Sequence, residues 1–295
     1  MFNYYEEIKE KLIDNEIKRG VKIFSINQGI VETYYYVGKI LYEAGKHYGE
    51  NIIGEYSKKL ENDIGKKYSI TLLKRMRKFY IVFQKSAPSG HLSWSHYRVL
   101  ITIKNEKERN YYINEIKKRN LTKREFEEIY KHKEYNRLSL KTKNKIAINQ
   151  NREISELIKD PIFIYNNSNI QIYSEKVLQN IILNNISIFL NELGEGYSFI
   201  DNEYKIKIGN TYNYIDLLLF NYKYNCFVVI ELKIVELKKE HIGQIEIYMN
   251  YIDKNIKEVN HNKTIGIIIC KKDNKFIIEY ASDKRVITRE YKLIV

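Results

Sequence analysis

Three ionisable residues lie near the ends of two consecutive apolar segments, where together they could hydrolyse a phosphodiester. Asp216 lies within the apolar run 214–220, and Glu231 and Lys233 end the next apolar run. If residues 222–225 form the turn of an antiparallel hairpin, Asp216 lies opposite Glu231, and Lys233 points to the same face as Glu231. Two half-buried carboxylates repel each other unless a divalent cation binds between them. The pattern therefore predicts a Mg²⁺ site, at which Mn²⁺ can substitute, beside an ammonium group.

The triplet by itself is a weak signal, because Asp and Glu-x-Lys are also common at solvated strand ends. Asp216 favours a functional site over that alternative. Apolar residues flank it on both sides, and an unpaired carboxylate is costly in such a position. We therefore expect the three residues to have a function.

The C-terminal half contains the helices and strands that must position these residues. One helix is expected from Glu175 to Leu190 and another from Lys239 to Ile252. The order strand, helix, strand predicts that segment 264–270 runs parallel to the strand that carries Glu231. The predicted sheet is therefore mixed, with helices flanking it. Its expected strands are residues 197–200, 204–208, 214–220, 226–233, 264–270 and 276–280.

The N-terminal half is predicted to be helical from residue 5 to about residue 132. Ser69 is a suitable N-cap for a basic helix over residues 70–80, after a turn at Gly65. A helix, a glycine-containing turn and a basic helix form the outline of a helix-turn-helix, although an ordinary bundle helix with a solvated basic face is an equal alternative. The basic residues that become candidates for nucleic-acid binding are Lys74, Arg75, Arg77 and Lys78.

Two further N-terminal features predict local structure rather than chemistry. Thr122 and Glu125 have the spacing of a capping box. His96 has no Cys or Asp at a spacing that suggests catalysis, so we expect it to pack or to cap a helix.

The positive charge of the chain lies in its N-terminal half. The net charge is +13, and residues 1–150 contain 31 Lys and Arg against 18 Asp and Glu, whereas residues 151–295 contain 19 of each. A general bias toward lysine would raise its content everywhere, so the asymmetry predicts an N-terminal half that binds nucleic acid. We expect an α+β protein with a basic helical domain at 1–133, a linker at 134–152 and an α/β domain at 153–295.

Composition also predicts where the protein works. Cys226 and Cys270 both lie in apolar runs, so we expect small buried hydrophobes rather than a disulfide or a zinc site. The N-terminus lacks a signal-peptide pattern, and no apolar run approaches the roughly 20 residues of a membrane span. These features predict a soluble, cytoplasmic protein without a membrane partner.

Several segments resemble those of known nucleases. Asp216 followed by Glu231-Leu232-Lys233 resembles the motif of the PD-(D/E)XK nuclease superfamily. The resemblance covers nearly the whole chain. It implies a restriction-endonuclease-like α/β fold for residues 153–295, preceded along the chain by a helical domain of unknown function. The segments that resemble the YhcG-like bacterial family are 193–199, 214–218, 229–233, 243–248 and 264–271, together with Gly65, Ser69, 76–80 and 92–96 in the N-terminal half.

The resemblance implies a role for each matching residue. Asp216 and Glu231 would bind the metal, Lys233 would orient the attacking water, and Gln244 would support the water or the phosphate. One position departs from the family, whose first nuclease-domain helix tends to carry a Glu after a Leu. Here Leu178 is followed by Gln179, and Glu175 lies one turn earlier on the same helical face.

The function predicted from these features is metal-dependent endonucleolytic cleavage of DNA, in defence or in recombination. An inactive DNA-binding protein on a nuclease fold is the alternative that Gln179 suggests, and an RNA-directed nuclease is another. Cleavage of both strands of a duplex requires two active sites, which favours a homodimer. The sequence specifies neither the cleavage site nor the biological pathway.

Overall fold

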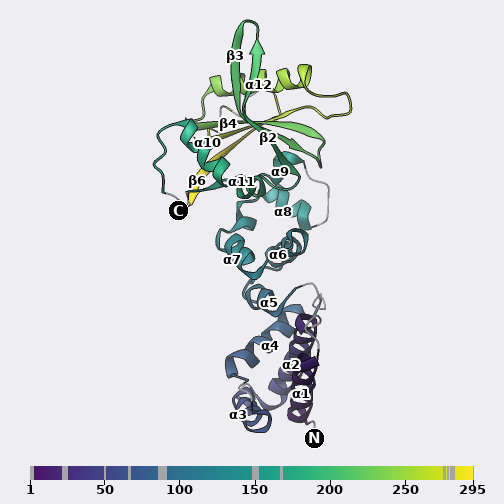
Figure 1. The fold of residues 1–295 in the computed structure, drawn as a ribbon. Helices are drawn as coiled ribbons and strands as arrows, with labels where there is room; N and C mark the ends of the chain where they lie inside the picture. The colour runs from purple at the N-terminus through teal and green to yellow at the C-terminus, as the bar shows by residue number, and fades with distance from the viewer. Residues whose placement is uncertain are drawn as a thin grey trace. The chain divides into compact units, whose positions relative to one another are not determined.

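In a computed structural model, the chain forms two compact units, residues 1–135 and residues 136–295 (Figure 1). The structure describes residues 3–21, 26–49, 51–65, 68–85, 92–147, 153–166, 169–274, 277, 279 and 283–294. We refer to the two parts as the N-terminal unit and the C-terminal unit.

The N-terminal unit is helical, as predicted. Its core contains Leu12, Val37, Leu60 and Met76, all of which are fully or almost fully buried. Helices α2 and α4 approach closely at Gly38, where a Cβ atom would lie 2.1 Å from the carbonyl oxygen of Met76. The helices are α1 (Tyr4–Val21), α2 (Ile26–Tyr48), α3 (Ile52–Ile64), α4 (Ile70–Phe83), α5 (Trp94–Leu100), α6 (Glu106–Arg119) and α7 (Lys123–Lys131).

The capping contacts confirm two predicted helix starts and agree with the role expected of His96. The Ser69 hydroxyl accepts a hydrogen bond from the Leu72 N–H at the start of α4. Thr122 and Glu125 form the expected capping box of α7. His96 is buried, and its Nδ1 accepts from the Ser93 N–H, so this residue caps α5. Its burial and this hydrogen bond fit the expected role in packing or capping.

Part of the predicted linker folds with the C-terminal unit. The boundary between the units falls inside the 3₁₀ helix η1 (Glu134–Arg137), and α8 (Leu140–Ala147) follows it. Thr142 is fully buried, and its hydroxyl donates to the carbonyl oxygen of Glu156. Residues 148–152 lie outside the described residues.

The C-terminal unit is built on a mixed six-stranded sheet in the order β1-β6-β5-β4-β3-β2. Strands β2, β3 and β4 are antiparallel, whereas β4, β5, β6 and β1 are parallel, so the expected parallel pairing beyond the Glu231 strand is confirmed. The fold is α+β, as predicted. The strands are β1 (Ile162–Tyr165), β2 (Tyr197–Ile208), β3 (Thr211–Asn221), β4 (Cys226–Glu236), β5 (Ile265–Lys272) and β6 (Val286–Ile294), and the helices are α9 (Ile154–Leu157), α10 (Glu175–Asn184), α11 (Ile186–Leu193) and α12 (Lys239–Asn255).

Helices cover both faces of this sheet (Figure 1). On one face Val228, Ile230 and Leu232 of β4 share a buried cluster with residues of α10 and α11. On the other face Val229 packs with Ile245 and other residues of α12. Because side chains alternate along a strand, Glu231 and Lys233 point to the α12 side of β4.

Three details of the predicted sheet are wrong. The expected strands 197–200 and 204–208 form one continuous strand, β2, and strand β1 was not expected. A strand was also expected at 276–280, but the two residues of this segment that the structure describes, Ile277 and Glu279, are helical. Ile277 packs against the α12 core, and a short apolar run of this kind fits a helix or a strand equally well. The last strand is β6 instead.

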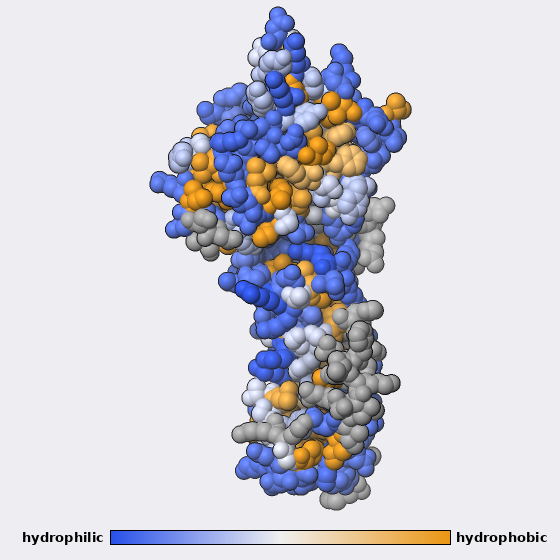
Figure 2. Space-filling view, viewed as in Figure 1, coloured by the Kyte–Doolittle hydropathy of each residue, from blue (hydrophilic) through white to orange (hydrophobic). Residues whose placement is uncertain are grey.

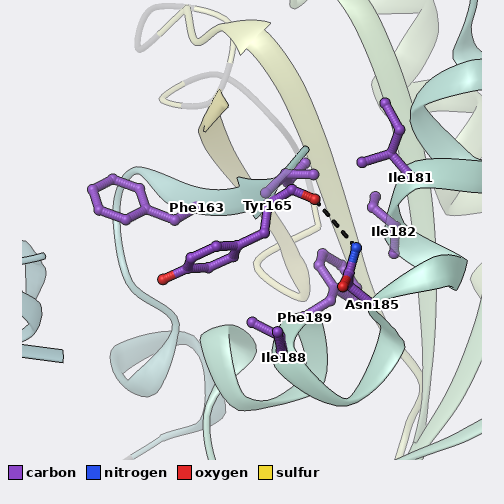
Figure 3. A pocket seen from close by; sticks show the side chains of 8 residues that line it. Phe163, Tyr165, Ile181, Ile182, Asn185, Ile188 and Phe189 are labelled. Carbon is purple, nitrogen blue, oxygen red and sulfur yellow. Dashed lines mark hydrogen bonds between the residues drawn. The ribbon is translucent and has the colours of Figure 1, made fainter. Parts of the chain in front are cut away.

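One small hollow lies inside the C-terminal unit. A hollow between β1, α10 and α11 has a volume of only about 10 Å³, room for no more than a single water (Figure 3). Asn185 donates from Nδ2 to the carbonyl oxygen of Tyr165 beside it. None of the described helices has an apolar stretch long enough to cross a bilayer, and hydrophilic residues dominate the face in Figure 2.

Candidate active site

The hairpin of β3 and β4 has the register that the sequence predicts. Residues 222–225 form the turn, and the pairs run from Asn221 with Cys226 to Leu217 with Ile230. The next position in this register brings Asp216 beside Glu231. Main-chain pairing between the strands ends one step earlier, at Leu217.

The Asp216 side chain replaces the missing main-chain contact. Its Oδ2 accepts a hydrogen bond from the Leu232 N–H at 2.7 Å. Its main-chain oxygen accepts another from Nε2 of Gln179 on α10, also at 2.7 Å. Burial raises the pKa of the Asp216 carboxyl, and the negative charges of Glu175 and Glu203 add to that effect.

Glu231 is a buried carboxyl with one oxygen left without a partner. The residue is 1% exposed, and no described group forms a hydrogen bond with Oε1. Oε2 lies 3.2 Å from the Lys233 ammonium. Burial, followed by the charge of Asp216, raises the pKa of Glu231 to about 8. A buried carboxylate oxygen without a hydrogen-bond partner costs free energy unless it binds an ion or another ligand.

Lys233 links β4 to the start of α10. Its Nζ lies 3.2 Å from Glu231 and 3.4 Å from Oε2 of Glu175. Burial alone would lower the pKa of this lysine, but the two glutamates outweigh it, and the pKa lies above its usual value. Ser174 caps α10 by accepting from the Val177 N–H, which fixes Glu175 in the first helical turn.

Helix α12 contributes polar side chains near the same carboxylates. Gln244 lies on this helix as predicted, but its Nε2 donates to the Tyr248 hydroxyl at 3.0 Å instead of to Asp216 or Glu231. Burial raises the pKa of Tyr248, and Glu231 contributes to the increase. Burial lowers the pKa of His241, and the ammonium of Lys233 lowers it further.

The donor set fits a hard divalent cation held by few protein ligands. Across the described ranges, no three Asp, Glu, His or Cys side chains are gathered as a complete metal cluster. Mg²⁺ usually retains several waters and binds one or two carboxylates together with substrate phosphates. Asp216 and Glu231 supply two carboxylates, and the partnerless Oε1 of Glu231 is available as a ligand atom.

Comparisons with known proteins agree in both units. Residues 155–295 match the family described as the YhcG PDDEXK nuclease domain, and residues 8–137 match the DUF1016 N-terminal domain. The chain is also 24% identical to "Putative nuclease YhcG" of Escherichia coli (strain K12), in an alignment that covers 98% of this chain and 90% of that protein. The chain is thus similar to YhcG-like PD-(D/E)XK nucleases over both of its units.

Two solved structures share weaker similarity with this YhcG-like chain. A repair endonuclease from Pyrococcus abyssi is 20% identical, with 42% of this chain and 48% of that chain covered and a TM-score of 0.30. The EndoMS–dsDNA2 complex is 16% identical, with 44% and 48% covered and the same TM-score of 0.30. The matches span about half of each known chain, and scores this low support no conclusion about function.

Gln179 of α10 is the neutral residue at the position where the family resemblance leads us to expect a Glu. It is 2% exposed, and its amide nitrogen holds the main chain of Asp216 in place. Glu175, one turn earlier, contacts Lys233. The neutral amide therefore has a positioning role for which a carboxylate is unsuited, because a carboxylate cannot donate to a carbonyl oxygen.

Two neighbours of the site could not be recognised from their sequence context. Glu203 on β2 takes a positive φ of 50° and raises the pKa of Asp216. The register of β2 and β3 places it opposite Asp216. His241 lies on α12 and its pKa responds to Lys233. The positions of Glu203 and His241 near the site depend on strand register and helix packing. Tyr248, by contrast, lies in a segment that the sequence analysis had identified, residues 243–248.

The YhcG-like N-terminal unit brings basic side chains of three helices together. Lys74, Arg75 and Lys78 of α4 are exposed, whereas Arg77 is half-buried near Gly45 of α2. A hollow of about 340 Å³ lies between α4, α5 and α7. Its charged lining residues are Arg75, Lys78, Arg98, Lys123 and Glu127, and Lys123 pairs with Glu127 at 2.9 Å. The hollow thus includes two of the four predicted residues and adds two cations.

Proposed function

We propose that this protein is a metal-dependent endonuclease that hydrolyses phosphodiester bonds of DNA. The observation that supports the proposal is the group formed by Asp216, Glu231 and Lys233. Two carboxylates and an ammonium converge, and a buried carboxylate oxygen has no partner among the described residues. A cluster of buried charged side chains does not stabilise a hydrophobic core, whereas metal-dependent hydrolysis of a phosphodiester requires such a cluster.

Each side chain has a distinct role in the proposed reaction. Asp216 and Glu231 hold a divalent cation, with Mg²⁺ as the expected ion and Mn²⁺ as a substitute. When it is bound, this cation lowers the pKa of water and neutralises charge on the phosphate. Lys233 orients the attacking water and stabilises the developing charge, and Glu175 keeps the ammonium in place. Gln244 and Tyr248 position the phosphate or the water from α12.

The basic hollow of the N-terminal unit is proposed to hold the DNA backbone. Arg75, Lys78, Arg98 and Lys123 present four cations from three helices, and one acidic residue accompanies them. Cations that converge from several elements can follow the phosphates of a strand more closely than one helix face can. Lys74 lies on the exposed surface of the same helix and extends this patch.

Plasmid cleavage by the purified protein tests the catalytic proposal. Supercoiled DNA should be nicked or linearised with Mg²⁺ or Mn²⁺, but not with EDTA and not by the Asp216→Asn variant. Lack of cleavage by the wild type with either ion would reject it. Binding without cleavage would support the alternative, an inactive DNA-binding protein, which the neutral Gln179 favours.

Two narrower questions have direct measurements. Competition for binding to labelled DNA separates a DNA enzyme from an RNA-directed one. If the protein acts on DNA, unlabelled DNA should displace the labelled DNA efficiently and unlabelled RNA should not. A homodimer would supply two copies of the site for the two strands of a duplex. Light scattering of the DNA complex should therefore give twice the 35.5 kDa mass of one chain as its protein component.

A further inference from the structure

The ribbon formed by the ends of β2 and β3 leaves the sheet at Asp216. Main-chain pairing of β3 with β4 ends at Leu217, whereas its pairing with β2 continues to Thr211. Residues 204–208 and 211–215 therefore form a two-stranded ribbon, which extends beyond the other strands (Figure 1). At about 3.4 Å per residue, its tip lies roughly 17 Å from Asp216.

One face of the ribbon is anchored to the core. Ile206 and Ile215 are buried in the cluster that α12 completes. The ends of the ribbon are joined by the turn Gly209–Asn210, where Gly209 takes a positive φ of 59°. A two-residue hairpin turn requires such a backbone angle, and glycine adopts it without steric cost. The ribbon is therefore a fixed part of the C-terminal unit rather than a loose loop.

The opposite face combines lysine and tyrosine. Lys205 pairs with Tyr214 across the ribbon, and Lys207 pairs with Tyr212. The Lys205 ammonium lies 3.9 Å from the centre of the Tyr212 ring, which holds the cation in place. Tyr212 is 52% exposed and Tyr214 is 53% exposed.

The charge of this segment differs from that of its unit. Residues 204–215 contain two lysines and no acidic residue, although residues 151–295 as a whole carry equal numbers of basic and acidic residues. Tyr212 and Tyr214 lie on one face of the ribbon, opposite the buried Ile206 and Ile215, and Tyr214 precedes Asp216 by two residues. The basic, aromatic face therefore ends within two residues of the candidate catalytic carboxylate.

We propose that this ribbon is an arm that contacts duplex DNA beside the bond to be cut. Lys205 and Lys207 bind backbone phosphates, and Tyr214, the residue nearer Asp216, packs on a nucleotide next to the scissile phosphate. A two-stranded ribbon fits the major groove of B-DNA, which is about 12 Å wide. The assignment of the cut bond rests on the proposed nuclease function, but binding by the ribbon does not.

Binding measurements on the full-length protein in EDTA test the arm without any cleavage. Fluorescence anisotropy with a labelled duplex of 30 base pairs would give the affinity between 50 and 200 mM salt. The pair Lys205→Gln and Lys207→Gln should reduce the slope of log K against log salt by about 1.8, since each neutralised phosphate contributes about 0.9. Tyr214→Ala should weaken binding at least ~5-fold with little change in slope, and Tyr214→Phe, which keeps the ring, should bind as the wild type.

The matched control changes two exposed lysines of the same unit at the other end of the sheet. Lys254 lies in the last turn of α12 and Lys263 lies two residues before β5, so Lys254→Gln with Lys263→Gln should leave the slope unchanged. If the ribbon and control pairs give equal slopes and Tyr214→Ala binds normally, the arm is rejected, whatever the protein cleaves. If the ribbon variants lose binding and the wild type never cuts DNA with metal, the arm is retained and only the nuclease proposal fails.

Discussion

The carboxylate of Asp216 accepts the main-chain N–H of Leu232 at 2.7 Å, at the point where pairing between β3 and β4 ends. The residue therefore has a structural contact in addition to its proposed role as a metal ligand. This contact fixes the Asp216 side chain at the end of the strand that carries Glu231. Substitutions can separate the two roles.

Asp216→Asn and Asp216→Ala should both abolish metal-dependent cleavage but should differ in stability. Both remove the negative charge, and only Asn keeps an oxygen that can accept from Leu232. The free energy of unfolding of the Ala variant should be about 1–2 kcal/mol below that of the Asn variant, because a buried N–H loses its partner. Urea unfolding in EDTA measures the difference. Equal stabilities would show that the hydrogen bond contributes nothing.

The hairpin that carries the candidate site was predictable in detail because its pattern is local. The polar turn 222–225 between two apolar runs fixes the register, and the register places Asp216 beside Glu231. Ser69 and Thr122 were equally predictable, since a helix cap depends on residues within one turn.

The remaining features depend on contacts between distant segments. The bond from Gln179 to Asp216 spans 37 residues, and nothing in the local sequence indicates that the amide holds a main-chain oxygen. Arg98 and Lys123 join Arg75 in one hollow only because α4, α5 and α7 pack together. The short strand β1 pairs with β6 at the far end of the chain, which no local periodicity indicates.

Lys233→Met should slow cleavage at least ~10²-fold, the scale expected when a preorganised charge is lost. Glu231 and Glu175 would then lose their shared cation, but Mg²⁺ should still bind. Single-turnover cleavage gives the rate, and the Mg²⁺-induced increase in melting temperature reports metal binding. Lys238→Met, at an exposed lysine five residues further along the chain, is the control and should cleave normally. An unchanged rate for Lys233→Met would remove this residue from the mechanism.

The raised pKa of Glu231 should make the metal-free protein less stable as the pH rises. The pKa is about 8 in the folded protein against an ordinary value of 4.5, so the folded state holds a proton that the unfolded state has lost. Between pH 6 and pH 8 this group should reduce the free energy of unfolding by about 2–3 kcal/mol.

Glu231→Gln removes the titration and serves as the reference for all other groups. Urea unfolding in EDTA should therefore show the variant gaining stability relative to the wild type as the pH increases. Parallel curves for the two proteins over this pH range would mean that Glu231 titrates normally.

Gln179→Glu replaces the amide that holds the Asp216 main chain with a carboxyl group, and it should destabilise the metal-free protein. The new carboxylate would face the carbonyl oxygen of Asp216 without a proton to donate. The expected loss is about 1–3 kcal/mol at pH 8, since a buried hydrogen bond is lost. Asn180→Asp makes the same charge change at the exposed neighbouring position and should have little effect. An equal loss in both variants would assign the effect to charge on α10 rather than to the bond.

The basic hollow of the N-terminal unit should dominate the salt dependence of DNA binding. Changing Arg75, Lys78, Arg98 and Lys123 to Gln should lower the slope of log K against log salt by up to about 3.6, because each phosphate contact contributes about 0.9. Anisotropy in EDTA between 50 and 200 mM salt measures the slope. The control replaces four exposed lysines outside the hollow, namely Lys39, Lys58, Lys59 and Lys107.

The two quadruple variants separate a specific groove from general positive charge. Both remove four positive charges, so a purely long-range effect of net charge would weaken binding equally in the two proteins. A change in slope confined to the first variant would identify the hollow as the contact surface. If the slope of log K against log salt falls equally in the control and in the first variant, the DNA backbone does not follow the hollow. The helix-turn-helix interpretation of α3 and α4 would then also be rejected.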